Sequence, residues 1–251
     1  MGHSPRTLIV TGASRGIGAA TARRAAVAGW DVVVNCVADT AAAERVAADV
    51  RAAGRRAHVV RADASTEAGV RALFDAADRE FGALHGLVNN AGVVDTAQRV
   101  DAMAEARLAR MFTVNVVGPM LCAREAVRRM STRHGGRGGA IVNVSSAAAR
   151  LGSPNQYVDY AASKAAVDTF TKGLLLEVAA ESVRVNAVRP GIIDTGIHAS
   201  GGEPDRVQRL APLVPMQRAG SADEVAAAIV WLLGDDAGYV TGAVVDVAGG
   251  R

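Results

Sequence analysis

The stretch that decides the fold is Leu8-Ile9-Val10-Thr11-Gly12-Ala13-Ser14-Arg15-Gly16-Ile17-Gly18. Its first three residues form the short apolar run of a buried strand, and the alanine-rich segment 19–28 after it is typical of a helix. A glycine turn lies between them. Because free backbone N–H groups and the helix dipole both point at a bound anion, this order predicts a phosphate site. The spacing is Gly-x3-Gly-x-Gly rather than the Gly-x-Gly-x2-Gly fingerprint, so an ordinary glycine turn is the alternative.

Strand and helix patterns continue to alternate along the rest of the chain. Short apolar runs predict strands at 32–34, 58–60, 84–88, 140–144, 183–188 and 244–247. Helical patterns are found at 40–53, 67–81, 99–133, around Tyr160, and at 222–233. Ser221 precedes the last helix and Glu224 follows three residues on, which predicts a capping box. The alternation predicts an α/β fold with a parallel sheet and helices on both faces.

The composition excludes several classes of protein. Half of the 251 residues are apolar, yet no run of 18 apolar residues and no charged-then-apolar leader occurs, so we expect no membrane span, no signal peptide and a cytoplasmic location. The net charge of +3 is spread along the chain, which argues against nucleic-acid binding. Cys36 and Cys122 lie in apolar segments without metal-site spacing, so we expect buried free thiols and no metal.

The periodicity loosens between Asp194 and Gly220. Glycines and prolines interrupt this segment, while apolar residues such as Ile197, Leu213 and Val214 recur in it. Long irregular loops in compact domains are usually functional, so we predict a substrate lid at about 194–220. A plain surface excursion is the alternative.

A second motif is Tyr160-Ala161-Ala162-Ser163-Lys164. Residues four apart share one face of a helix, which places the phenol and the ammonium over the same small volume. An ammonium near a phenol favours the phenolate, so we expect a Tyr160 pKa lowered from about 10 toward neutrality. Such a group suits proton transfer at an alcohol or ketone oxygen. The alternative is an amphipathic helix with a packed tyrosine and a solvated lysine.

These motifs resemble the short-chain dehydrogenase/reductase family over residues 6–250. The matching pieces, in order, are Thr11-Gly12-x3-Gly16-x-Gly18, Asp63, Asn89-Asn90-Ala91-Gly92, Asn115, Ser146, Tyr160-x3-Lys164 and Pro190-Gly191-x3-Thr195. The resemblance implies one doubly wound Rossmann-type domain over 1–251, with a seven-stranded parallel sheet and helices on both faces. It also implies an NAD(P)-dependent enzyme that acts on CH-OH donors by hydride transfer.

The resemblance assigns four catalytic residues. Tyr160 would be the general acid/base, and Ser146 would hydrogen-bond the substrate oxygen. Lys164 would bind the nicotinamide ribose and lower the Tyr160 pKa, and Asn115 would hold a water that links Lys164 to solvent. Neighbouring Ser145 would point the opposite way on a strand, and the family pattern favours Ser146. Tyr157 has Ala161 rather than a lysine four residues on, so we expect it to be a pocket wall.

The resemblance also assigns the cofactor site. Asp63 would accept from the adenine amino group, Asn89 and Gly92 would lie along the adenosine ribose, and Ile193 and Thr195 would contact the carboxamide. The full predicted set is Gly12, Ser14, Arg15, Gly16, Ile17, Gly18, Asn35, Asp63, Ala64, Asn89, Ala91, Gly92, Tyr160, Lys164, Pro190, Gly191, Ile193 and Thr195.

The choice between the two dinucleotides depends on the end of the second strand. A carboxylate there chelates the ribose hydroxyls of NAD and repels a 2′-phosphate, but here no acid occurs before Asp39. Arg15 lies at a helix start, where a cation opposes the dipole and favours an anionic partner. We therefore expect NADP(H), with Arg15 and Asn35 at the 2′-phosphate. NAD(H) stays possible, because the second strand lacks the Arg or Lys that many NADP-using relatives carry.

The substrate class stays open between a small ketone, sugar or polyol and a 3-oxoacyl thioester on acyl carrier protein. The basic residues Arg124, Arg128, Arg129, Arg133 and Arg137 would suit an acidic carrier, although a solvated helix face is the favoured interpretation. A catalytically silent dinucleotide-binding sensor is a third possibility, against which the complete catalytic set argues. The resemblance further implies a homotetramer, formed through the long helices and the C-terminal strand.

Overall fold

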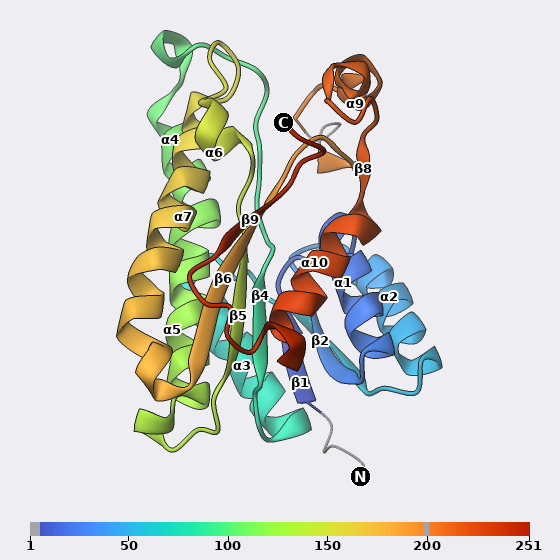
Figure 1. Ribbon diagram of the computed structural model, residues 1–251, viewed down its shortest axis with the longest axis vertical. Helices are drawn as coiled ribbons and strands as arrows, with labels where there is room; N and C mark the ends of the chain where they lie inside the picture. The colour runs from blue at the N-terminus through green and yellow to red at the C-terminus, as the bar shows by residue number, and fades with distance from the viewer. Residues whose placement is uncertain (1–5, 198–200) are drawn as a thin grey trace.

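The computed structural model describes residues 6–197 and 201–251. Its main feature is one parallel seven-stranded sheet (Figure 1). The strand order is β3 (Ala57–Arg61), β2 (Trp30–Cys36), β1 (Arg6–Val10), β4 (Gly86–Asn89), β5 (Gly139–Val144), β6 (Val183–Pro190) and β9 (Val244–Val247). The chain moves outward from β1 to β3 and then returns to β4 on the other side of β1. In such sheets ligands bind at this reversal, beyond the carboxyl ends of the strands.

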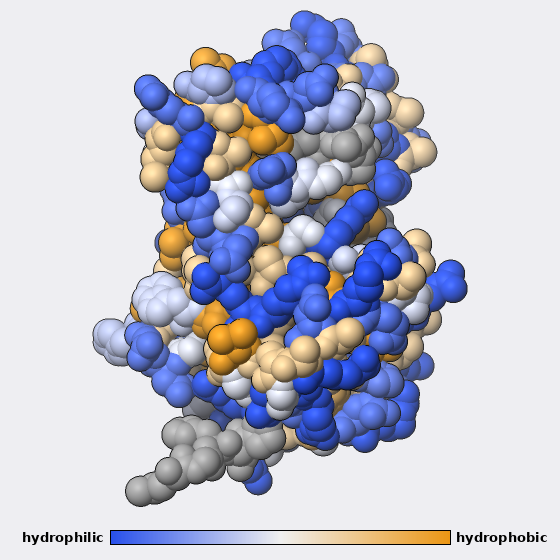
Figure 2. Space-filling view, turned by 90° about the vertical axis from the view of Figure 1, so that its right-hand side faces the viewer, coloured by the Kyte–Doolittle hydropathy of each residue, from blue (hydrophilic) through white to orange (hydrophobic). Residues whose placement is uncertain are grey.

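Helices cover both faces of the sheet, which confirms the predicted doubly wound α/β fold (Figure 1). One face carries α1 (Gly16–Val27), α2 (Thr40–Ala52) and α10 (Ala222–Leu233), and the other carries α3 (Glu67–Phe81), α5 (Gly118–Met130) and α7 (Val158–Val178). Figure 2 shows that mainly hydrophilic side chains cover the outer surface of the first layer. Within the described ranges, no helix has the length and apolar character needed to cross a bilayer.

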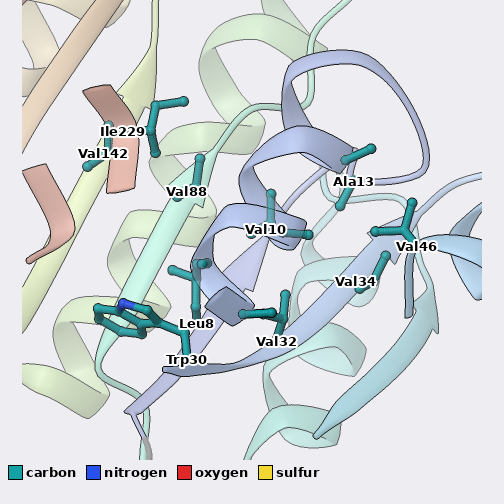
Figure 3. Close-up of a cluster of buried hydrophobic side chains, with 14 of the residues drawn as sticks. Leu8, Val10, Ala13, Trp30, Val32, Val34, Val46, Val88, Val142 and Ile229 are labelled. Atoms are coloured by element: carbon teal, nitrogen blue, oxygen red, sulfur yellow. The ribbon is translucent and has the colours of Figure 1, made fainter. Parts of the chain in front are cut away.

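The packing of the core explains why the run Leu8-Ile9-Val10 is apolar throughout. Leu8, Ile9 and Val10 are all fully buried, because a strand with helices on both faces must be apolar on both. Leu8 and Val10 pack with Trp30 toward α1 and α10 (Figure 3). Ile9 points the other way and packs in the cluster that contains Phe74. The alternation fixes the register of β1, and with it the position of the glycine turn that follows.

The prediction of one long helix over 99–133 is wrong. The structure has a 3-10 turn at Val100–Ala102, then α4 (Glu105–Phe112), a π-helical segment η2 (Thr113–Val117) and α5. The wide turn contains Asn115, which is completely buried and hydrogen-bonded to residues outside the helix. Pro119, the second residue of α5, has no N–H to donate. π segments of this kind often lie at functional sites.

Other predicted boundaries differ for identifiable reasons. β2 is longer than 32–34 because it includes buried Asp31, whose carboxylate pairs with Arg55 and Arg56. The ladder of β4 starts at Gly86 rather than 84, because the side chain of His85 accepts from Thr7 N–H. By contrast, α10 with its capping box and β9 were predicted residue for residue.

The segment predicted as a lid contains several short elements. They are β7 (Ile193–Asp194), α9 (Arg206–Leu210), a 3-10 turn at Ala211–Leu213, and β8 (Gly220–Ser221), which pairs with β7. Residues 198–200 of this segment lie outside the described residues, as does 1–5 of the predicted domain. The elements lie at the carboxyl end of the sheet (Figure 1). A lid function for them stays a prediction.

Candidate active site

The glycine turn after β1 is built by residues without side chains. Gly12 and Gly16 have φ values of +61° and +56°, a conformation that favours glycine. A Cβ at Gly12 would lie 3.0 Å from the Cα of Ala91, and one at Gly18 would lie 2.5 Å from Asn90 Nδ2. The turn is therefore packed tightly against the loop after β4. A side chain at Gly12 or Gly18 would displace the turn, and one at Gly16 would strain its positive-φ backbone.

Two asparagines brace this turn. Asn35, at the end of β2, accepts from Gly12 N–H at 3.2 Å and donates to the carbonyl oxygens of Val60 and Ala62. Asn90 donates through its amide to the carbonyl oxygens of Thr11 and Gly12. The Asn35 side chain is 1% exposed and fully engaged, so its geometry does not support the predicted contact with a 2′-phosphate. Asn90 was not among the predicted site residues, although the quoted Asn89-Asn90-Ala91-Gly92 motif contains it.

The start of α1 fits a phosphate group. Its N-cap, Arg15, is extended, makes no side-chain cap, and is followed by no acidic residue in the first turn. The first N–H groups of a helix have no partner inside the helix, so this end presents donors and a positive dipole. Ser14 and Ile17 flank it, and the Arg15 guanidinium is exposed, with no hydrogen bond or ion pair to a described residue. These residues fit a dinucleotide pyrophosphate.

The residues predicted to contact the adenosine differ in their exposure and in the direction of their side chains. Asp63 is exposed after β3, and one of its carboxylate oxygens accepts from the N–H and hydroxyl of Ser65. Ala64 lies buried beside it. The side chain of Asn89 points into the interior and donates to Asn143 Oδ1 at 2.9 Å and to the Pro119 carbonyl at 3.1 Å. Only the main chain of Asn89 is therefore free to follow a ribose, whereas Gly92 lines the pocket directly.

One pocket at the carboxyl ends of the strands brings nine of the predicted site residues together. Ser146 follows β5, Tyr160 and Lys164 come from the first turns of α7, and Pro190 ends β6. The predicted residues that line it are Ile17, Gly92, Ser146, Tyr160, Lys164, Pro190, Gly191, Ile193 and Thr195. A Cβ at Gly16 would lie 3.6 Å from Thr195, so the phosphate turn adjoins this pocket.

Tyr160 and Lys164 share one face of α7, as their spacing predicts. The Lys164 ammonium lies 5.7 Å from the centre of the Tyr160 ring. It donates to the carbonyl oxygen of Val144 at 2.8 Å, and the lysine is only 4% exposed. The carbonyl thus fixes the ammonium at the pocket wall beside the phenol.

The prediction of a lowered Tyr160 pKa is not what the structure gives. Burial raises the pKa of the Tyr160 phenol, and a hydrogen bond with Ser146 lowers it by less. Burial also lowers the pKa of Lys164 to about 8, while the charge of Asp168 works in the opposite direction. Both groups are held in a poorly hydrated space, which disfavours the charged form of each. In this arrangement the phenol is protonated at neutral pH.

Asn115 adjoins the same pair. Its amide oxygen accepts from Val93 N–H at 2.8 Å, and its amide nitrogen donates to the Val93 carbonyl and to Ser163 Oγ. A Cβ at Gly92 would lie 3.4 Å from both Asn115 Oδ1 and Lys164 Nζ. The π-helical segment η2 therefore brings Asn115 to the lysine, although its side chain is fully engaged.

The two adjacent serines have different surroundings. Ser145 is buried, and its hydroxyl donates to the main-chain oxygen of Lys164 at 3.1 Å, so it fastens α7 to the sheet. Ser146 is partly exposed, and its Oγ accepts from Ala148 N–H and bonds with Tyr160. The geometry supports Ser146 over Ser145 as the group that faces a ligand.

Tyr157 lines the pocket, in agreement with its interpretation as a wall. Its hydroxyl donates to the carboxylate of Glu203, and the Arg206 guanidinium lies 5.0 Å from its ring centre. Burial raises the Tyr157 pKa to about 12. This tyrosine is therefore a fixed phenol, with no lysine on the next turn.

The basic residues on and after α5 are mostly neutralised. Arg124 pairs with Glu67, Arg128 with Glu125, and Arg129 with Asp78 at 2.8 Å. These pairs leave little free positive charge for an acidic carrier protein. Both cysteines are buried and free, as predicted. Among the residues described, no group of three or more His, Cys, Asp or Glu side chains is placed to hold a metal ion.

The chain is similar to known proteins over nearly its whole length. A family model described as Enoyl-(Acyl carrier protein) reductase matches residues 12–251. The chain is 55% identical to the uncharacterized oxidoreductase YgfF of Escherichia coli K12, over 97% of this chain and 98% of that protein. It is 41% identical to the cis-4-hydroxycyclohexanecarboxylate dehydrogenase of Sinomonas cyclohexanicum, over 98% and 96%. A crystal structure of a short-chain type dehydrogenase/reductase from Mycobacterium marinum is similar with a TM-score of 0.92 and 32% identity, over 98% and 95%.

Proposed function

The chain belongs to the short-chain dehydrogenase/reductase family, whose members are oxidoreductases that act on CH-OH donors with a nicotinamide dinucleotide. We propose that it interconverts a secondary alcohol and a carbonyl compound. Tyr160 is the general acid/base in this proposal. The main support for this proposal is that Ser146, Tyr160 and Lys164 line one pocket next to the phosphate turn. Proton transfer needs such a group within reach of the substrate oxygen.

Each of the pocket residues has a separate role in the proposed reaction. The chemistry supplied by a bound nicotinamide dinucleotide is hydride transfer at the reacting carbon. In reduction, Ser146 donates a hydrogen bond to the carbonyl oxygen, and Tyr160 gives that oxygen its proton. Lys164, fixed by the Val144 carbonyl, would bind a ribose hydroxyl of the dinucleotide, and its charge stabilises the phenolate that remains. Because the Asn115 amide is fully engaged, its proposed part is to keep its segment beside Lys164, where a water would return the proton from solvent. Oxidation runs the same steps in reverse.

Turnover of a panel of ketones and secondary alcohols tests the proposal, followed by the absorbance of the reduced nicotinamide. We expect at least one pair to be interconverted. Tight dinucleotide binding without turnover of any member would favour the silent sensor instead.

The pH dependence of the two directions should differ in sign. Oxidation needs the phenolate of Tyr160 as proton acceptor, and the pKa of this phenol is raised by burial. Below that pKa the phenolate fraction rises by up to about tenfold per pH unit, so kcat/KM for alcohol oxidation should increase from neutral to alkaline pH. Reduction needs the neutral phenol and should be fastest at or below neutral pH. Initial rates in both directions measure this, and faster oxidation at pH 6 than at pH 9 would contradict it.

We propose NADP(H) as the preferred dinucleotide. β2 ends at buried Cys36, and exposed Val37 follows it. The next acid, Asp39, uses its side chain to cap α2 through Ala42 N–H at 2.8 Å. No carboxylate is thus held ready for the ribose hydroxyls of NAD, while the Arg15 guanidinium has no partner among the described residues. With Asn35 engaged elsewhere, Arg15 carries the 2′-phosphate contact alone.

Arg15→Ala tests this assignment. We expect kcat/KM for NADPH to fall by about 10- to 100-fold, the usual value of a hydrogen bond to a charged group, and kcat/KM for NADH to change much less. Arg23→Ala is the matched control, because Arg23 lies on the same helix and pairs with Asp49 at the surface. A tenfold advantage of NADH over NADPH in the unchanged protein would overturn the assignment.

We further propose a homotetramer in the cytoplasm. Large apolar side chains are exposed near the π segment (Phe112, Val117 and Met120) and beyond α10, where Tyr239 is fully exposed. Apolar surface of this kind commonly marks protein contacts. The buried free thiols of Cys36 and Cys122 suit a reducing compartment. The 3-oxoacyl-carrier reductase remains the second candidate, but the ion pairs of Arg124, Arg128 and Arg129 do not favour it.

A further inference from the structure

The charged lining of the active-site pocket has one sign. Among the described residues that line it, the charged side chains are Lys164, Arg206 and Arg251, and no aspartate or glutamate is present. Lys164 is held by the Val144 carbonyl. Arg206 is held by Glu203 and by the amide oxygen of Gln156 at 3.0 Å. Arg251 is the third cation of this lining.

Arg251 is fixed in place by its main chain. Its N–H donates to the Ala248 carbonyl at 3.2 Å, and its main-chain oxygen accepts from Arg150 Nη2 at 2.8 Å. Its guanidinium has no hydrogen bond or ion pair to any described residue, although the residue is partly buried. Burial and the neighbouring charge of Arg206 both lower the Arg251 pKa. By contrast, Arg24 and Arg218 on the surface each pair with a carboxylate.

The position of Arg251 assigns it to the substrate side of the pocket. The end of the chain lies between α6 (Ala148–Leu151) and α9, beyond the carboxyl ends of the strands (Figure 1). The contact with Arg150 fixes it next to α6. The dinucleotide-binding features, by contrast, follow β1 and β4. A group bound at Arg251 would therefore belong to the substrate rather than to the phosphates of the cofactor.

We propose that the enzyme selects carbonyl and alcohol substrates that carry a carboxylate or a phosphate, and that Arg251, with Arg206 beside it, binds this anionic group. The inference rests on the proposed function, because it names the class of substrate for the same site. A guanidinium offers a planar fork of donors that matches either anion in a bidentate manner. A partly buried guanidinium beside a second one gains most from such a partner, since a bound anion relieves both the burial and the repulsion.

Matched substrates test the inference. The probes are a series of keto acids with increasing distance between ketone and carboxylate, the methyl ester of each, and a phosphorylated hydroxyketone with its free alcohol. We expect at least one acid or phosphate to exceed its neutral counterpart about tenfold or more in kcat/KM. Preference within the acid arm identifies a carboxylate as the natural anion, and preference within the phosphate arm identifies a phosphate.

Substitution then assigns the preference to one residue. Arg251→Gln should lower kcat/KM for the preferred anion by about 10- to 100-fold and bring its ratio to the neutral counterpart close to one. Arg251→Lys should retain part of the ratio because it keeps the charge. Arg218→Gln is the control, since it removes the same charge from an exposed residue outside this pocket and should keep the ratio.

The outcomes separate this inference from the proposed function. No turnover of any acid, ester or phosphate would contradict the function itself. Turnover of neutral and anionic partners at equal kcat/KM, or a ratio unchanged in Arg251→Gln, would overturn the inference and leave the function intact. A change in the native mass of Arg251→Gln with an unchanged ratio would mean that this arginine pairs with a second copy of the chain, which also overturns it.

Discussion

Replacing Tyr160 by phenylalanine should lower kcat by about 10²- to 10⁴-fold, the usual contribution of a general acid/base. The substitution keeps the ring packed on α7 and removes only the hydroxyl that Ser146 contacts. Dinucleotide binding should stay within about twofold, because the phosphate turn and Lys164 are untouched. Steady-state kinetics and fluorescence titration with NADPH measure the two quantities.

Tyr157→Phe is the matched control for this prediction. It makes the same chemical change in the same pocket, but the Tyr157 hydroxyl donates to Glu203, which keeps Arg206 and Arg209 as partners. We expect its kcat to fall by less than about tenfold. Wild-type turnover by Tyr160→Phe, or an equal loss of kcat in both variants, would contradict the role of Tyr160 as the general acid/base.

The fold could be predicted where local pattern and tertiary structure agree. The run Leu8-Ile9-Val10 reads as a buried strand because both sheet faces are covered, and the Ser221 capping box needs only residues within one helical turn. The break at Asn115 could not be predicted in the same way. The apolar period continues through it, whereas the wide turn depends on Val93 and on Ser163, 48 residues away.

In the site too, features set by local sequence could be predicted, whereas features set by distant contacts could not. The spacing of Tyr160 and Lys164 is local, so a helix is enough to place them together. The bracing role of Asn35 depends on the Ala62 carbonyl, just after the neighbouring strand β3, and the inward orientation of Asn89 depends on Asn143. The sign of the Tyr160 pKa shift depends on burial, which the motif does not encode. Arg107, which lies 53 residues before Tyr160, was not predicted for the same reason.

Arg107 and Asp159 form a buried clamp beside Tyr160, the proposed general acid/base. Arg107 Nε donates to Asp159 Oδ2 at 2.7 Å and its Nη2 to Oδ1 at 3.2 Å, with side chains 8% and 0% exposed. Arg107 Nη1 also donates to the Thr96 carbonyl at 2.7 Å. The clamp therefore joins α4, the loop after β4 and the first turn of α7, where Asp159 directly precedes Tyr160.

Arg107→Ala should lower the free energy of unfolding by about 3–5 kcal/mol, because it leaves the Asp159 carboxylate buried without a partner. Equilibrium urea unfolding measures the loss. Arg110→Ala is the control on the same helix, since exposed Arg110 pairs with Asp95 only at 3.7 Å and should cost less than about 1 kcal/mol. The double variant Arg107→Ala, Asp159→Asn should recover part of the stability, because no unpaired charge then remains. A loss below about 1 kcal/mol for Arg107→Ala would mean that water reaches Asp159, and the first turn of α7 would then need another anchor to hold Tyr160 in the pocket.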